Sequence, residues 1–234
     1  MKRIYPTLFS LLLLSLLGAS WPFSSLFISS NHEAFGSASW MQKETALLKS
    51  QAGNIDDKVL QLSLRAYVHA RNKGLDSKQL LTVIDYSKPS NRRRLWVFNM
   101  KTGRVLYNTW VSHGRNSGQV KATSFSNSPG SLKSSIGVFM TASTYFGGKG
   151  YSLRLRGLEN GFNDNAFRRD IVIHGAPYVN ADIIRKYGQA GRSWGCPAVG
   201  VKLATPIINT IKDDTLIFAY YPDPKWLASS RYLV

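Results

Sequence analysis

The sequence predicts a mainly β domain with a few short helices and one helix at its N-terminal end. Two observations favour this class. Short runs of β-branched and aromatic residues follow one another, and turn-forming clusters join them without an intervening helix, which is typical of antiparallel sheets. At 234 residues, 44% of them hydrophobic, the chain is long enough for one core of ordinary size.

The first twenty residues have the pattern of a secretory signal. Met1-Lys2-Arg3 is a basic start, residues 8–17 are an apolar run too short to span a bilayer, and Gly18-Ala19-Ser20 supplies the small residues of a cleavage site. Cleavage as late as Ala38 and an uncleaved anchor are alternatives, because apolar residues continue beyond the run. We therefore expect a periplasmic or cell-wall-associated protein, with membrane contact only through an uncleaved signal.

The rest of the chain is predicted to divide into three parts. Residues 21–53 are Ser-rich and are expected to be a linker or loosely attached arm. Residues 54–221 form the domain, which begins with a helix that is capped near Asn54 and ends before Gly74. Residues 222–234 are expected to be a peripheral tail.

Within the domain, local patterns predict strands and two short helices, and residues 113–165 are expected to be a long, irregular and functional excursion broken by one strand. The predicted strands cover residues 81–86, 94–99, 104–111, 136–142, 171–173 and 215–221, and the predicted helices cover residues 181–187 and 202–211.

Charge and composition exclude several kinds of site. Lys and Arg number 30 against 13 Asp and Glu, so the net charge of +17 predicts an anionic partner. Nucleic acid is disfavoured, since the protein is expected to be exported and its basic residues are dispersed. The four histidines show no short metal-binding spacing and Cys196 is the single cysteine, so no metal or cofactor is expected. A serine hydrolase is disfavoured because no G-x-S-x-G is present.

Cys196 is the first candidate for chemistry. It follows Gly195 in a predicted turn, where the backbone can approach a ligand closely. His174 ends a predicted strand and is followed by Gly175, so it could serve as a base that lowers the pKa of the thiol. The alternative is a buried thiol with an unrelated, hydrogen-bonded histidine.

Two motifs together resemble the murein L,D-transpeptidase catalytic-domain family, in a divergent second branch. These are Ile171-Val172-Ile173-His174-Gly175 and Ser193-Trp194-Gly195-Cys196-Pro197-Ala198. The resemblance covers roughly residues 80–221, but Trp194 stands where the better-known branch has histidine, and Ala198 stands where it has a polar residue. The upstream segments that also fit are residues 111–114, 124–127, 134–137 and 151–159.

The resemblance implies an L,D-transpeptidase-like β-sandwich or barrel that acts on peptidoglycan stem peptides. Cys196 would attack the stem peptide and form a thioester, and His174 would move the protons. An acceptor amine would then give a cross-link, whereas water would make the protein a carboxypeptidase. Backbone N–H groups of residues 194–196, Gly195 included, would bind the oxyanion. Ser193 would orient the catalytic pair or the substrate or, equally, cap the turn.

The remaining expectations concern the substrate. His113 could contact it or hold the loop of residues 124–127, and we favour the structural role. Other function classes also stay open: a hydrolase that trims stems or releases wall-linked protein, and a non-catalytic wall-binding protein. The protein is expected to be a monomer. The candidate substrate contacts are Gly175, Trp194, Arg192, His113, Asn127 and Arg154.

Overall fold

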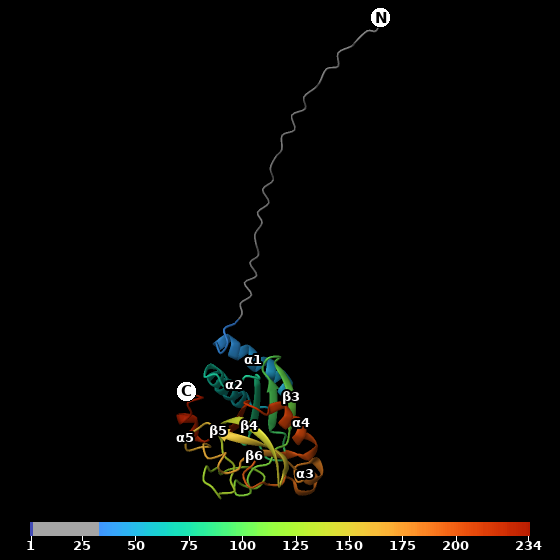
Figure 1. Ribbon diagram of the computed structural model, residues 1–234, viewed down its shortest axis with the longest axis vertical. Coiled ribbons are helices and arrows are strands. Elements are labelled where there is room, and N and C mark those ends of the chain that lie inside the picture. The colour runs from blue at the N-terminus through green and yellow to red at the C-terminus, as the bar shows by residue number, and fades with distance from the viewer. Residues whose placement is uncertain (2–32) are drawn as a thin grey trace. The chain divides into compact units, whose positions relative to one another are not determined.

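An eight-stranded mixed sheet organises the part of the chain that the computed structural model describes, Met1 and residues 33–234 (Figure 1). The predicted signal and residues 21–32 of the predicted linker lie outside the described residues. The strands are β1 (Leu80–Asp85), β2 (Leu95–Asn99), β3 (Arg104–Thr109), β4 (Gly137–Gly147), β5 (Gly150–Gly157), β6 (Val172–Ala176), β7 (Ala198–Gly200) and β8 (Leu216–Tyr220).

The strand order is β3-β2-β1-β8-β4-β5-β6-β7, and the sheet confirms the predicted sheet-rich fold. Only the β1–β8 and β6–β7 pairs are parallel. Every residue of β1 and β8 is buried, because these central strands are covered on both faces. Their Val, Ile, Leu and Phe side chains belong to a single apolar core that also contains Trp96 and Trp226.

Two of the predicted helices are confirmed with small shifts, and a third is confirmed at its predicted bounds. Helix α2 (Asp57–Asn72) begins where the Asp56 carboxylate accepts the backbone N–H groups of Lys58 and Val59. Helix α3 (Ala181–Tyr187) runs from an Asn180 cap to Gly188 in the left-handed conformation. Helix α4 (Val201–Ile211) buries its apolar face on β6 and its neighbours.

Residues 38–52 form helix α1 (Ala38–Ala52) rather than a linker. The helix buries Leu48 and Ala52 against α2 and the sheet, and the Ala52 carbonyl accepts the Trp96 indole N–H at 3.1 Å. Its few apolar residues give a weak periodic signal, and its docking depends on partners far along the chain. No helix in the described residues is long and apolar enough to cross a membrane.

The C-terminal tail is not peripheral. Helix α5 (Pro224–Ser229) places Trp226 in the core, and Tyr232 and Leu233 are also buried. The buried Glu159 carboxylate holds this segment: one oxygen accepts the Trp226 indole N–H at 2.9 Å, and the other accepts the Ser230 hydroxyl. The tail therefore completes the domain.

The predicted excursion of residues 113–165 contains more structure than expected. Residues 137–157 form the β4–β5 hairpin, closed by the Gly147–Gly150 pair. Strand β5 is thus a strand that the sequence analysis missed, although Tyr151, Leu153 and Leu155 alternate along it. Ser152 on β5 pairs with His174 on β6, so this hairpin delivers its tip to the neighbourhood of the predicted base.

Candidate active site

The sheet brings the two predicted catalytic residues to the same place. His174 is the third residue of β6, and its register partner on β7 is Ala198, two residues after Cys196. The cysteine loop therefore enters β7 beside His174, although the residues are far apart in sequence. No hydrogen bond joins the imidazole to the thiol within the described part of the chain.

The His174 ring is buried, and its contacts define its tautomer. Nδ1 lies 2.9 Å from the Gly175 carbonyl oxygen, which can only accept, so Nδ1 carries the proton and Nε2 is left as an acceptor. Burial lowers the pKa of His174 below its usual 6.5, and the charge of Lys149 lowers it further. At neutral pH the ring is neutral and can take a proton through Nε2.

The Cys196 thiol is half-buried and protonated in its resting state. Sγ donates to the Asp170 carbonyl oxygen at 3.5 Å. Burial raises the pKa of the thiol, and the Val172 backbone N–H and the Arg169 guanidinium oppose that rise without cancelling it. The resting pair is therefore a neutral thiol and a neutral imidazole.

Ser193 holds the turn that presents the cysteine. Its buried hydroxyl donates to the Cys196 carbonyl at 2.6 Å and accepts the Gly195 N–H at 3.1 Å. The geometry thus gives Ser193 the turn-capping role of the two that the sequence left open.

Two further buried serines, Ser112 and Ser134, bind the backbone of the same loop. The Ser112 hydroxyl lies 3.4 Å from the Cys196 carbonyl oxygen and accepts the Ala198 N–H at 3.1 Å. The Ser134 hydroxyl donates to the Gly195 carbonyl at 3.0 Å. We call Ser112, Ser134 and Ser193 the serine clamp.

Gly195 is required by the backbone of this loop. Its φ is +125°, a region that disfavours other residues, and a Cβ there would lie 2.8 Å from the Lys133 carbonyl oxygen. Its N–H is already taken by Ser193, so it is not the oxyanion donor that the sequence suggested. The Trp194 and Cys196 N–H groups have no partner among the described residues, so they can still serve.

Two cations lie near the thiol, and the sequence analysis identified neither as a site residue. Arg169 is anchored by hydrogen bonds to the Ser126 and Lys133 carbonyls and to the Ser131 and Ser135 hydroxyls, and its charge lowers the pKa of Cys196. Lys149, at the tip of the β4–β5 hairpin, acts in the same direction. Arg169 falls just before the strand that carries His174, but its role depends on loop contacts that local patterns do not show.

Three candidate substrate contacts lie around the loop. Trp194 is 69% exposed, and Lys149 Nζ lies 5.7 Å from its ring centroid. Arg154 pairs with Asp170 at 3.2 Å, and the Asp170 carbonyl is the partner of the thiol. Arg192 donates from one guanidinium nitrogen to the Arg115 and Gly118 carbonyls and lines a cavity with Tyr178.

Gly175 has an indirect place in the site, because its carbonyl oxygen fixes the His174 tautomer. An added Cβ would lie 3.1 Å from the Ala204 side chain, so the glycine also lets α4 pack closely.

The polar side-chain atoms of His113 and Asn127 are engaged within the protein. His113 is fully buried, donates through Nε2 to the Gly118 carbonyl at 3.3 Å and accepts from Arg94 through Nδ1 at 2.8 Å. Burial and the Arg94 charge lower its pKa to about 4. The Asn127 side chain is bonded to Asp164 and to the backbone N–H of Asn165, so it ties two loops together.

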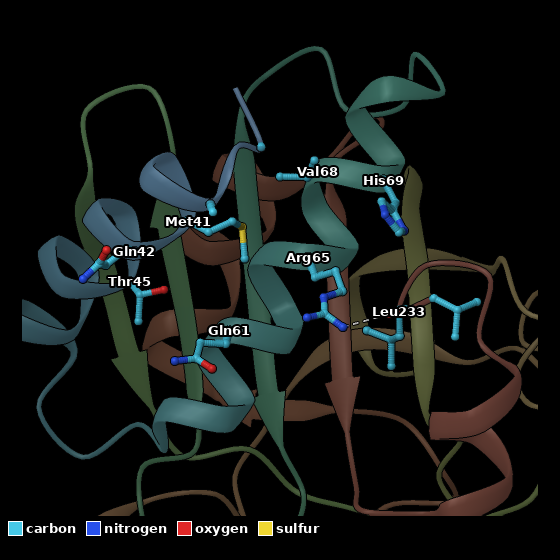
Figure 2. Close-up of a pocket in the computed structure, with 11 residues that line it drawn as sticks. Met41, Gln42, Thr45, Gln61, Arg65, Val68, His69 and Leu233 are labelled. Atoms are coloured by element: carbon cyan, nitrogen blue, oxygen red, sulfur yellow. Dashed lines mark hydrogen bonds between the residues drawn. The ribbon is translucent and has the colours of Figure 1, made fainter. Parts of the chain in front are cut away.

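The described residues were expected to hold no metal ion, and two cavities lie outside the cysteine loop. The described residues contain no group of three or more His, Cys, Asp or Glu side chains placed to hold a metal ion. A cavity of about 660 Å³ lies between α1, α2 and the C-terminal residues, where Arg65 reaches the Leu233 carbonyl (Figure 2). A cavity of about 400 Å³ lies nearer the site, lined by Lys149 and Gly175 among others.

Residues 51–220 match the model of the L,D-transpeptidase catalytic domain. The chain belongs to the L,D-transpeptidase catalytic-domain family. The match includes the sheet, the cysteine loop and both predicted catalytic residues, and so confirms the resemblance to this family; the divergent branch stays a prediction. Among curated proteins, no sequence relative matches the chain.

Solved structures of L,D-transpeptidases resemble this fold at low identity. An L,D-transpeptidase from Mycobacterium smegmatis is 15% identical with a TM-score of 0.38, covering 61% of this chain and 59% of that one. L,D-transpeptidase 3 from Mycobacterium tuberculosis is 12% identical with a TM-score of 0.40 and covers 61% of each chain. An L,D-transpeptidase from Stackebrandtia nassauensis is 13% identical with a TM-score of 0.35 and covers 76% of each. The chain spans about three fifths of the length of the first two proteins.

Proposed function

We propose that this protein is a cysteine acyltransferase that cross-links or modifies peptidoglycan stem peptides. The observation that carries the proposal is the clamped, half-buried Cys196 beside an imidazole whose free Nε2 is a base at neutral pH. Membership of the family supplies the substrate class, and the strongly basic chain suits an anionic wall polymer. We further propose that it acts outside the cytoplasm, as its N-terminal sequence suggests.

In the proposed reaction, His174 Nε2 takes the thiol proton as Cys196 attacks the stem-peptide carbonyl. A sulfur–carbon bond forms, the carbon–nitrogen bond to the terminal D-alanine breaks, and the imidazolium returns its proton to the leaving amine. The free N–H groups of Trp194 and Cys196 are the candidates to bind the oxyanion. An acceptor amine then attacks the thioester and releases the thiol.

The neutral resting pair fits this sequence of steps. Because the pKa of the thiol is raised and that of the imidazole is lowered, the proton leaves sulfur only when the attack begins. The same thioester can be hydrolysed by water, so a stem-trimming carboxypeptidase is the outcome that the test must separate from transfer.

The test is mass spectrometry of purified tetrapeptide muropeptides incubated with the protein or with Cys196→Ala. We expect a cross-linked dimer with the wild type and none with the variant, while the far-UV spectrum of the variant is unchanged. Ser143→Ala is a matched control, since this residue is exposed on β4 and belongs neither to the cysteine loop nor to the strand of His174.

Each other result has a defined meaning. Tripeptide without dimer would indicate hydrolysis rather than transfer. Turnover retained by Cys196→Ala would refute the nucleophile. An unchanged substrate with every protein, together with retained binding to intact sacculi, would favour the non-catalytic wall-binding function.

A further inference from the structure

Lys149 occupies the tip of the β4–β5 hairpin, next to the candidate active site. Gly147 and Gly150 close the turn, and Lys149 is exposed between them. From this tip β5 runs back to Ser152, which pairs with His174. The hairpin thus carries a cation past the end of the strand that holds the imidazole.

The Lys149 charge is unpaired by any acid of the described residues. Its Nζ forms no ion pair there and lies 5.7 Å from the centroid of the exposed Trp194 ring. Trp194 lies two residues before Cys196 on the clamped loop. An ammonium held over this ring stands at the mouth of the site and is free to meet an anion.

A cavity of about 400 Å³ adjoins this ammonium. Gly175, the neighbour of His174, forms part of its wall, and Pro177, Val201 and Ala204 make another part apolar. Among the described residues, Lys149 is the only charged one that lines it, and none of the acidic side chains does. The cavity therefore combines one positive charge with a small apolar surface, on the α4 side of the strand that carries the predicted base.

We propose that Lys149 and this cavity form a subsite for the free C-terminal carboxylate of the residue that leaves from the acyl donor. The inference rests on the proposed function. It adds that the Lys149 ammonium selects acyl donors with a free terminal carboxylate. In such a donor the terminal carboxylate lies one residue beyond the carbonyl that Cys196 attacks. A terminal D-alanine offers a carboxylate for Lys149 and a methyl group for the apolar wall.

The subsite explains how the chain would choose its cleavage point. A donor extended by further residues would leave Lys149 facing a neutral peptide bond, and a donor with an amidated end would offer no anion. The ammonium can follow the carboxylate because a lysine acts as a mobile point charge on a flexible stem. The enzyme would thus release a single terminal residue from each donor.

The experiment compares two donors that differ only at their end, a stem tetrapeptide with a free C-terminal carboxylate and its C-terminal amide. We expect kcat/KM of the wild type to be about tenfold higher for the acid, and Lys149→Met to reduce this ratio to about one. Lys101→Met is the matched control, because Lys101 is an exposed lysine at the tip of another hairpin, β2–β3, and should keep the wild-type ratio.

Comparing the two donors within each variant cancels any effect of Lys149 on the thiol itself. A Lys149→Met enzyme that keeps the wild-type preference for the acid would overturn the subsite and leave the proposed acyl transfer standing. A wild type that turns over both donors equally would overturn it as well.

Alkylation of Cys196 supplies a readout that needs no turnover. N-acetyl-D-alanine should slow iodoacetamide labelling of the wild type several-fold, its amide should not, and neither should protect Lys149→Met. If the wild type turns over neither donor, the proposed function fails, and the protection pattern alone then decides the subsite. Equal protection by acid and amide would refute it.

Discussion

Replacing Ser193 by alanine tests whether the serine clamp positions the nucleophile. The change removes a hydroxyl that donates to the Cys196 carbonyl and accepts the buried Gly195 N–H. The Cys196 carbonyl keeps the Ser112 hydroxyl at 3.4 Å, but the Gly195 N–H is left without a partner. A buried donor without a partner costs about 1–3 kcal/mol. For a domain of this size, about 2 kcal/mol lowers Tm by about 4–8 °C.

The turn also sets the direction from which the thiol attacks, so activity should fall together with stability. We expect Ser193→Ala to lower kcat/KM by about 10- to 100-fold, because small misplacements of reacting groups are costly. The assays are thermal unfolding by circular dichroism and turnover of the tetrapeptide donor. Ser63→Ala is the control, since this buried hydroxyl bonds only the Leu60 carbonyl of its own helix and should alter neither quantity greatly. Lost activity with an unchanged Tm would refute the clamp and assign Ser193 to the chemistry.

Three further predictions follow from buried polar groups. The pKa of His113 is about 4 in the folded protein against an ordinary 6.5. As the pH falls, the unfolded chain therefore binds the proton before the folded protein does. The free energy of unfolding should decrease between pH 6.5 and 4, by about 3 kcal/mol at most. His113→Gln, which keeps an acceptor for Arg94, should flatten this dependence in urea unfolding, and an unchanged slope would contradict the assignment. Glu159→Gln places an amide among three donors and should cost about 2 kcal/mol, measured by thermal unfolding; an unchanged Tm would show that the carboxylate does not hold the tail. Because the pKa of His174 lies below 6.5, kcat/KM should be complete at pH 7 and fall through an acid limb below pH 6.5, and His174→Gln should slow alkylation of Cys196; an acid limb above pH 6.5 would contradict the neutral base.

Local patterns predict the parts of the fold whose order is encoded within a short stretch. Helix α3 was predicted at its observed bounds because Asn180 and Gly188 supply both end signals. Strand β8 was predicted because its apolar run is short and lies between turns. Helix α1 and the tail were not, because what orders them is distant: Trp96 for the end of the helix, and Glu159 for Trp226.

The residues of the candidate site also differ in whether local sequence predicts them. Cys196 and His174 were identified from their motifs, since the residue types and the adjoining glycines are local. The serine clamp and Arg169 were not identified, because each acts through contacts that only the fold creates. His113 shows the converse, since a histidine between a serine and a glycine resembles a site residue but lies buried against Arg94. Tertiary contacts, rather than residue identity, decide these roles.

The electrostatics of the resting site connect the donor carboxylate with the catalytic step. Lys149 lowers the pKa of both His174 and Cys196, so the free enzyme has a weakened base. A carboxylate bound at Lys149 would neutralise that charge and raise the pKa of His174 toward its ordinary value. Arg169 acts on the thiol more strongly than Lys149 does and stays anchored by its four hydrogen bonds, so it would continue to lower the pKa of Cys196. Binding of the donor would thereby strengthen the base while Arg169 continues to stabilise the thiolate.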